Sequence, residues 1–471
     1  MLAAQPGEAV SPLVRKLAHR QEPTAASTAA PAAPAAGPPP TADEEAQLRL
    51  LRNKIHENLI AELDLSAAGK SDESESQIRQ ATEGVMARVL ADTSLPLQTK
   101  KKEQLIEDVL NEAMPNRFGP LEPLLRNPAI SEIVVNCCSE VFVEQKGRLD
   151  PAQVNGRPVR FDDDSHLRRI IDKILAPIGR RVNERTPMAD GRLPDGSRVN
   201  VAIPPVALKG SSLTIRKFSD KPLTVEDLIG WGTLTQEMRD FLEACVHARL
   251  NIIIAGGTGS GKTSSLNVMA AFIPMHERVV TVEDSAELRL PQPDLVTLEA
   301  RPPNIEGEGQ ITIRDLVRNC LRMRPDRIVV GEVRGGECLD MLQAMNTGHD
   351  GSLATCHSNS PRDTVSRLET MTLMSGMDLP IHVISKQIAS AVQLIVQQSR
   401  LSDGSRKIIN ITEVQGMEGE TVLLQDIFVF EQRGIDGEGK VQGQHRPTGF
   451  RPRCMDLLIQ AGCKLPPSTF M

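Results

Sequence analysis

One eight-residue segment constrains this chain more than any other feature. Residues 256–263 read G-G-T-G-S-G-K-T and satisfy the pattern G-x-x-x-x-G-K-[ST]. An apolar run at 251–255 predicts a strand that leads into the segment, and residues 263–273 predict a helix that leaves it. Because a chance glycine-rich turn would lack this strand and helix, the context favours a phosphate-binding loop.

The chemistry of such a loop explains its composition. Glycines let successive backbone N–H groups face phosphate oxygens, and the helix that follows adds its positive N-terminal end. We expect Lys262 to reach the β- and γ-phosphates of a nucleoside triphosphate and the Thr263 hydroxyl to bind Mg²⁺. The residues expected to bind the nucleotide are Gly256, Gly257, Thr258, Gly259, Ser260, Gly261, Lys262 and Thr263.

Two acidic groups follow predicted strands. Glu283, Asp284 and Glu287 come after the run at 278–282, and Glu332 comes after the apolar run at 328–330. The ends of parallel strands are where such sheets place their chemistry, so Glu283 and Glu332 are candidate catalytic carboxylates. Glycine precedes Glu332, so the usual Mg²⁺-holding Asp is absent, and Thr263 with waters and Glu332 is the candidate metal site. Solvated loop residues or helix caps are the alternative.

Two histidines and three arginines complete the candidate site. His357, at the end of a predicted strand, is a candidate donor to the γ-phosphate, whereas a structural role is equally compatible with His349. No third ligand recurs at zinc spacing. Arg192, Arg198 and Arg216 lie on or beside a predicted hairpin and strand. They are either arginine fingers that reach the nucleotide or solvated strand residues, and the sequence leaves both readings open.

From residue 233 onward, predicted helices and strands alternate, which requires a mostly parallel sheet with helices packed on it. The predicted strands are 251–255, 278–282, 295–299, 327–330 and 352–355. The predicted helices are 236–248, 263–273, 313–323, 336–346, 363–374 and 380–398. Two β-rich runs, 407–414 and 421–430, close this domain (233–430), and we expect the tail at 431–471 to be loosely ordered.

The chain before residue 233 divides into four parts. Residues 1–42 form an Ala/Pro-rich tail and linker, and a helical module follows at 43–115, whose apolar stripe is either a core or a docking face. Residues 116–220 predict an α+β domain with a hairpin formed by 188–193 and 198–203 and a strand at 213–217, followed by a connector at 221–232. The fold class expected is α/β.

The amino-acid composition argues against two kinds of function, nucleic-acid binding and membrane spanning. With 54 basic and 61 acidic side chains, ten Phe, one Trp and no Tyr, the chain has a net charge of −7 and few base-stacking side chains. Nucleic-acid binding is therefore disfavoured. No apolar run approaches the roughly 20 residues that span a bilayer, so we expect a cytoplasmic protein with at most peripheral membrane contact.

Four segments together resemble one family. The phosphate loop and residues 281–287 (T-V-E-D-S-A-E), 324–335 (R-P-D-R-I-V-V-G-E-V-R-G) and 348–359 (G-H-D-G-S-L-A-T-C-H-S-N) look like the Walker A, Asp, Walker B and His boxes of type II and type IV secretion ATPases. Residues 188–200 and 213–218 resemble the tight-adherence (Flp) pilus assembly branch of that family, the CpaF type. The likeness covers roughly residues 116–430.

The resemblance implies a RecA-like ATPase core and a homohexamer, with ATP and Mg²⁺ between the α+β and RecA-like domains. It implies ATP hydrolysis that moves one domain against the other, and docking on an inner-membrane platform protein that extracts or secretes pilin-like subunits. The family's box residues map to Lys262, Thr263, Glu283, Glu332 and His357. Glu283 is then the first choice for polarising water, and Glu332 supports the metal and the nucleophile.

The same sequence motifs are compatible with other functions. A type IV secretion traffic ATPase or a pilus retraction motor would share these boxes. A nucleic-acid translocase on the same core and a nucleotide-gated scaffold that hardly hydrolyses ATP are further alternatives. The missing tetracysteine zinc module argues against the type II secretion branch.

Overall fold

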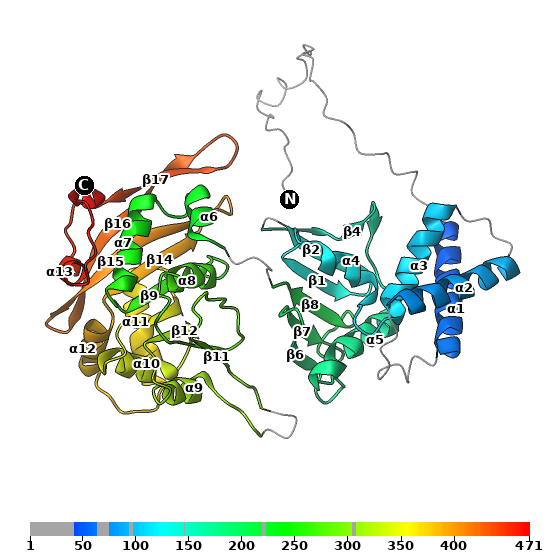
Figure 1. Cartoon of the computed structure of the whole chain (residues 1–471), viewed down its shortest axis with the longest axis horizontal. Helices are drawn as coiled ribbons and strands as arrows, with labels where there is room; N and C mark the ends of the chain where they lie inside the picture. Colours follow the sequence, from blue (N-terminus) through cyan, green and yellow to red (C-terminus); the bar gives the residue numbers. More distant parts are fainter. Residues whose placement is uncertain (1–41, 64–74, 94–97, 146, 219–222, 304–307) are drawn as a thin grey trace, which may run out of the picture. The chain divides into compact units, whose positions relative to one another are not determined.

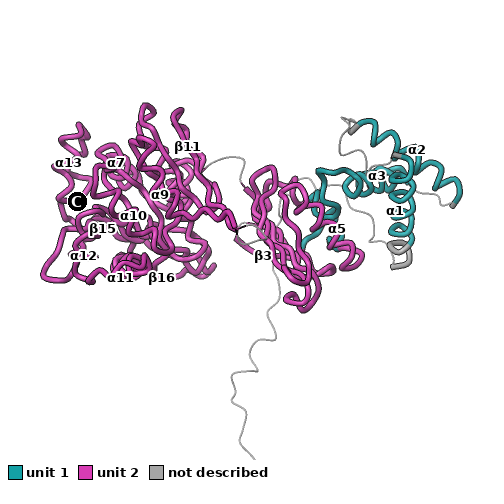
Figure 2. Tube along the Cα trace, turned by 90° about the horizontal axis from the view of Figure 1, so that it is seen from below, with its two compact units in different colours: residues 1–123, 152–160 teal, residues 124–151, 161–471 magenta. Residues whose placement is uncertain are grey.

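The computed structural model describes residues 42–63, 75–93, 98–145, 147–218, 223–303 and 308–471. The chain forms two units, which Figure 2 colours separately: residues 1–123 with 152–160, and residues 124–151 with 161–471. The Ala/Pro-rich tail and linker expected at 1–42 lies outside the described residues except for Ala42.

The first unit is built around three helices. They are α1 (Ala42–Leu63), α2 (Glu75–Thr93) and α3 (Thr99–Ala113), followed by the 3₁₀ turn η3 (Gly119–Leu121) and the short pair β4 (Gln153–Val154) and β5 (Arg157–Pro158). Ile55, Leu59, Val85 and Val109 are buried in a common core. The apolar stripe of α1 is therefore core and not a free docking face. The short helix α4 (Glu122–Arg126) leads from this unit into the second.

The second unit begins with an antiparallel sheet in the order β3-β2-β1-β8-β7-β6 (Figure 1). Its strands are β1 (Glu132–Cys137), β2 (Glu140–Gln145), β3 (Arg148–Pro151), β6 (Met188–Arg192), β7 (Arg198–Ala202) and β8 (Ser212–Arg216). The alternating pattern of β1, β7 and β8 buries every second side chain. The ends of α5 (Asp164–Leu175) and η4 (Ala176–Ile178) lie against β6, where Leu175 and Ile178 approach Gly191. The predicted hairpin is confirmed, because β6 pairs with β7 from Met188 opposite Ala202 to Arg192 opposite Arg198.

A nine-stranded sheet forms the rest of the unit, in the order β11-β10-β12-β13-β9-β14-β15-β16-β17. The strands from β11 to β14 run parallel, as the alternation of helices and strands predicted, and β15 to β17 are antiparallel. The parallel strands are β9 (Ile252–Gly256), β10 (Val279–Glu283), β11 (Leu295–Glu299), β12 (Arg327–Val333), β13 (Leu353–His357) and β14 (Leu394–Arg400). The antiparallel strands are β15 (Arg406–Glu418), β16 (Thr421–Ile435) and β17 (Val441–Pro447).

Helices cover both faces of this sheet, so its central strands are apolar on both sides. In β9, Ile252 and Ile254 join one core, whereas Ile253 and Ala255 join the other. The first core contains residues of α6 (Val225–Gly230), α7 (Gln236–His247), α8 (Lys262–Ala270) and α13 (Met455–Gln460). The second contains residues of α9 (Ile313–Cys320), α10 (Glu337–Asn346), α11 (Pro361–Leu373) and α12 (Ile381–Ala391).

One predicted helix is wrong in its second half. The helix expected at 380–398 ends at Ala391, and the chain continues as β14, which pairs in parallel with β9. The run Leu394-Ile395-Val396 is buried on both faces. A continuous apolar run has no period of its own, so the sequence does not separate a buried strand from a buried helix there.

The C-terminal tail is ordered, which corrects the expectation of a loose segment. β17 pairs with β16, and α13 and the 3₁₀ turn η5 (Pro467–Phe470) follow. Phe470 is buried with its ring centroid 5.6 Å from that of Phe241 in α7. Within the residues described, no helix combines the length and hydropathy that crossing a bilayer requires.

A buried carboxylate fastens this tail to the sheet. Glu413 of β15 is 3% exposed and accepts hydrogen bonds from the backbone N–H of Cys454 (2.7 Å) and of Arg453 (3.0 Å). The N–H group of Cys454, directly before α13, is buried and would otherwise lack a partner. Glu413 therefore joins the tail to a central part of the fold.

Glu413→Gln is expected to destabilise the protein by about 1–3 kcal/mol, because the amide replaces one accepting oxygen by a donor that faces an N–H group. The midpoint of urea unfolding measures the change. Glu420→Gln, at an exposed carboxylate in the β15–β16 turn, is the control and should leave the midpoint unchanged. Equal midpoints for both variants would contradict the assigned role of Glu413.

Candidate nucleotide site

The phosphate loop lies where β9 ends and α8 begins. Gly259 (φ 68°) and Gly261 (φ 96°) adopt left-handed backbone conformations that favour glycine. A Cβ atom on Gly261 would lie 3.1 Å from the Gln398 amide nitrogen and 3.2 Å from Cδ of Arg406. Residues of β14 and β15 therefore close over the loop and leave room only for glycine at this position.

Lys262 folds back over its own loop. Its Nζ donates to the Gly257 carbonyl at 3.1 Å, and the Ser260 hydroxyl donates to the same oxygen at 2.9 Å. Burial lowers the pKa of Lys262, while the nearby Glu332 carboxylate opposes that shift. The ammonium group is thus held at the loop by a backbone carbonyl that a phosphate oxygen can replace.

A cleft of about 600 Å³ opens beside the loop and gathers most of the predicted residues. The predicted residues that line it are Arg198, Arg216, Thr258, Gly259, Gly261, Lys262, Thr263, Glu332 and His357. Further residues line it that the sequence did not single out for the nucleotide, among them Phe218, Asn267, Arg289, Arg334 and Arg367. Arg289 lies over the ring of Phe218, with Cζ 4.2 Å from the centroid. Glu283, Arg192 and His349 are not among the lining residues.

Glu332 and His357 meet at one end of the cleft. Nδ1 of His357 lies 3.8 Å from Oε1 of Glu332, and its Nε2 lies 3.4 Å from the Thr258 hydroxyl. The second carboxylate oxygen of Glu332 pairs with Arg334 at 2.7 Å, and Arg334 also pairs with Asp284 at 3.1 Å. Because β13 and β9 run parallel, His357 ends its strand beside the loop. His349 precedes β13 and so lies toward the opposite edge of the sheet.

Glu283 occupies a different environment from Glu332. It ends β10, is 2% exposed, and its Oε2 accepts hydrogen bonds from the backbone N–H of Glu287 (2.8 Å) and Leu288 (3.1 Å). Burial raises the pKa of Glu283 to about 7, although these two N–H groups oppose the shift. The carboxyl group is therefore poised to gain or lose a proton near neutral pH, inside a turn formed by the residues that follow it.

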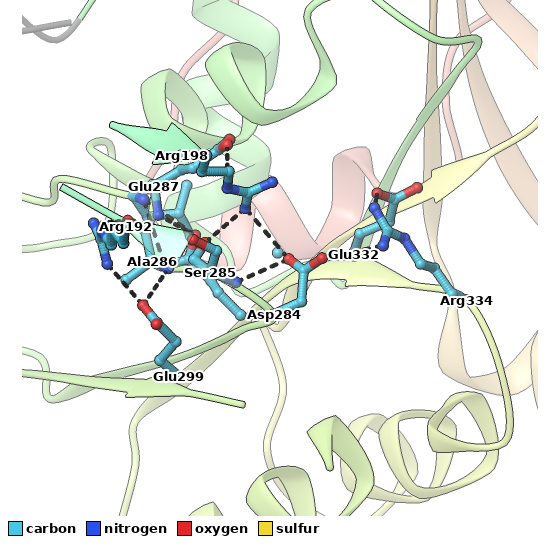
Figure 3. Close-up of polar contacts among 12 residues, drawn as sticks. Arg192, Arg198, Asp284, Ser285, Ala286, Glu287, Glu299, Glu332 and Arg334 are labelled. Carbon is cyan, nitrogen blue, oxygen red and sulfur yellow. Dashed lines mark hydrogen bonds and ion pairs between the residues drawn. The ribbon is translucent and has the colours of Figure 1, made fainter. Parts of the chain in front are cut away.

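The hairpin arginines contact that same turn (Figure 3). Arg198 donates to the Ser285 carbonyl at 3.1 Å and pairs with Glu287 at 3.2 Å and Asp284 at 3.6 Å. Arg192 donates to the Ala286 carbonyl at 2.6 Å and pairs with Glu299 at 2.7 Å. Arg216 also lines the cleft, and its positive charge acts on the carboxylate of Glu132, its neighbour on β1. The three candidate fingers thus differ, because the guanidinium groups of Arg192 and Arg198 hold the 284–287 turn and that of Arg216 does not.

The oxygen donors in the cleft suit Mg²⁺. Thr263 and Glu332 line the same cavity, and one carboxylate oxygen of Glu332 is not paired with Arg334. Across the described ranges, no three His, Cys, Asp or Glu side chains gather as a metal site. The residues present therefore fit a magnesium ion that takes its remaining ligands from phosphate and water, as Mg²⁺ commonly does.

Comparison with known proteins identifies relatives. A profile described as "Type II/IV secretion system protein" matches residues 115–432. The chain is 37% identical over 307 residues to a putative conjugal transfer protein of Mycobacterium tuberculosis, covering 64% of this chain and 85% of that one. It is 32% identical over 322 residues to the type IV secretion system protein VirB11 of Brucella suis, covering 62% and 87%.

Two solved structures are among those similar to this chain. The VirB11 ATPase from the Brucella suis type IV secretion system, in complex with sulphate, shares 30% identity at a TM-score of 0.34 and covers 62% of this chain and 95% of that one. The pilus retraction motor PilT with bound ADP shares 19% identity at a TM-score of 0.44 and covers 71% and 83%.

The environment of Glu283 predicts a pH-dependent stability. Between the ordinary pKa of 4.5 and about 7, the folded state binds a proton that the unfolded state has released, so stability falls as pH rises through this window. Glu283→Gln cannot lose this proton, and its amide oxygen can still accept both N–H groups. The stability of the variant relative to the wild type should therefore increase by about 3 kcal/mol between pH 4.5 and pH 8.

Urea unfolding at several pH values checks this expectation. Glu418→Gln, at an exposed carboxylate of β15, serves as the control whose difference from the wild type stays constant with pH. A constant difference for Glu283→Gln as well would show that the carboxyl is already ionised at pH 5.

Proposed function

The chain belongs to the type II/IV secretion system protein family, and we propose that it is an ATPase motor whose Mg²⁺-dependent ATP hydrolysis powers the assembly of an Flp or type IV-like pilus, or protein secretion, at the inner membrane. The observation that supports this function most directly is the cleft, in which Lys262 and Thr263 of the phosphate loop face Glu332, Arg198 and Arg216.

Nucleotide binding begins with the loop. On binding, Lys262 would exchange the Gly257 carbonyl for the β- and γ-phosphates, and Thr263 and Glu332 would hold a magnesium ion. That ion would supply positive charge that neutralises the phosphates. His357, beside Thr258, donates to the γ-phosphate from the end of β13.

Glu283 and Glu332 have different roles toward the attacking water. We assign the polarisation of water to Glu283, because a carboxyl with a pKa of about 7 accepts a proton efficiently at neutral pH. This carboxylate is held by the N–H groups of Glu287 and Leu288, and we infer that the 284–287 turn shifts before Glu283 faces the cleft. Glu332 supports the metal and the nucleophile from its position in the cleft.

The motor also requires a way to transmit the state of the nucleotide. Arg192 and Arg198 hold the turn that follows Glu283, so movement of the hairpin domain moves this turn. We assign the role of arginine finger to Arg216. We assign two roles to Arg198, which acts as a second finger in the cleft and also holds the 284–287 turn. The working assembly is a homohexamer on the cytoplasmic side of the inner membrane, bound to a platform protein and acting indirectly on pilin-like subunits.

A type IV secretion traffic ATPase is the second candidate function. It is favoured by the relatives described as conjugal transfer and type IV secretion proteins. Complementation of cells that lack the protein distinguishes the two functions. Restored pilus assembly without restored substrate transfer would favour the pilus motor, and the opposite result would favour the traffic ATPase.

Lys262→Ala is expected to lower kcat for ATP hydrolysis at least about 100-fold, since it removes a positive charge from the transferring phosphate. Phosphate release in the presence of Mg²⁺ measures the effect. Lys440→Ala, at an exposed lysine of the β16–β17 turn, is the control. The same substitution in cells should abolish pilus assembly or secretion, and full function without hydrolysis would refute a motor.

Arg216→Ala is expected to lower kcat about 100-fold or more with little change in KM, because a finger acts on charge that develops in the transition state. Arg148→Ala, at an arginine 82% exposed on β3 of the same sheet, is the matched control. Mixing Arg216→Ala with Lys262→Ala chains tests the geometry. Restored hydrolysis would mean that the finger reaches a neighbouring subunit, and its absence would mean that it acts within its own chain.

A further inference from the structure

The phosphate loop is held from outside by one side chain that the proposed mechanism does not use. Arg406, the first residue of β15, donates from Nε to the Gly259 carbonyl at 2.9 Å. Its Cδ lies 3.2 Å from where a Cβ of Gly261 would stand, so its methylene groups cover the next glycine as well. The two contacts lie on either side of Ser260.

The hydrogen bond to Gly259 has a consequence for the adjacent N–H group. A trans peptide is planar, and its C=O and N–H point in opposite directions. When the Gly259 carbonyl is held outward by Arg406, the N–H of Ser260 points into the loop, where it lies 3.4 Å from the Gly257 carbonyl oxygen. That long contact leaves the N–H group available for a phosphate oxygen.

The position of Arg406 is itself fixed by the end of the β14–β15 hairpin. Leu401 donates to the Ser405 carbonyl at 2.8 Å, and Asp403 accepts from the N–H groups of Ser405 and Val441, each at 2.9 Å. On the adjoining strand, the buried Gln398 accepts from the Ser265 hydroxyl at 2.8 Å. The hairpin therefore contacts the loop through Arg406 and the start of α8 through Gln398.

We propose that Arg406 is a positioning residue that sets the phosphate loop in its nucleotide-binding shape before the nucleotide arrives, through the hydrogen bond from its Nε to the Gly259 carbonyl. This inference rests on the proposed function, because it concerns the same loop. Without the bond, the 259–260 peptide is free to rotate, and part of the binding free energy must then restore its orientation.

Two substitutions separate the hydrogen bond from the charge. In Arg406→Gln, the amide nitrogen takes the place of Nε and remains a donor without positive charge. In Arg406→Met, a methyl group takes the same place and donates nothing. Arg433→Met, at an exposed arginine of β16, removes an equal charge away from the loop.

Binding of a fluorescent ATP analogue with Mg²⁺ to the full chain is the primary measurement. Arg406→Met is expected to bind about tenfold more weakly than the wild type at both low and high salt, while Arg406→Gln stays within about threefold and Arg433→Met is unchanged. In hydrolysis, Arg406→Met should raise KM about tenfold and leave kcat nearly unchanged, because the loop holds ground state and transition state alike.

Two results would overturn the inference. Unchanged binding by Arg406→Met would show that the loop keeps its shape without the contact. Equal losses for Arg406→Gln and Arg406→Met that vanish at high salt would show that Arg406 acts only by its charge. A wild-type chain that binds no nucleotide would instead refute the proposed function, so the two failures are distinguishable.

Discussion

A phosphate loop binds its ligand only if several backbone N–H groups point inward together, and much of the second unit serves that requirement. β9 brings the chain to the loop from between two neighbouring parallel strands, and α8 leaves the loop at Lys262 and buries Ser265 and Leu266. The carbonyl groups that would otherwise compete for the interior are held by Lys262, Ser260 and Arg406. The loop is therefore shaped by strands and side chains from distant parts of the sequence.

The turn at 284–287 brings several charged side chains together. Its carbonyl groups accept from Arg192 and Arg198, its N–H groups donate to Glu283 and Glu299, and its Asp284 pairs with Arg334. A turn held by so many exposed or half-buried ion pairs is less rigid than the sheet behind it, since such pairs contribute little individually. This difference suits the shift of the turn that we propose for catalysis.

Sequence patterns predicted some of these features and could not predict others. The parallel strands β9 to β13 followed from alternation of apolar runs and helices, and the boxes placed Lys262, Glu332 and His357 at strand ends that do meet. The strand at 394–400 was missed because a fully buried run has no helical or strand period. Arg406 lies far from the loop in sequence, and only the pairing of β14 and β15 brings it there. The burial of Glu283 likewise depends on the fold of residues that follow it.

The ordered tail also bears on how the protein is made. Phe470 and the residues around α13 cover Phe241 of α7 and Phe428 of β16, both of which are synthesised earlier. The aromatic cluster therefore joins segments that lie far apart in the sequence, and it can form only after Phe470 has been synthesised.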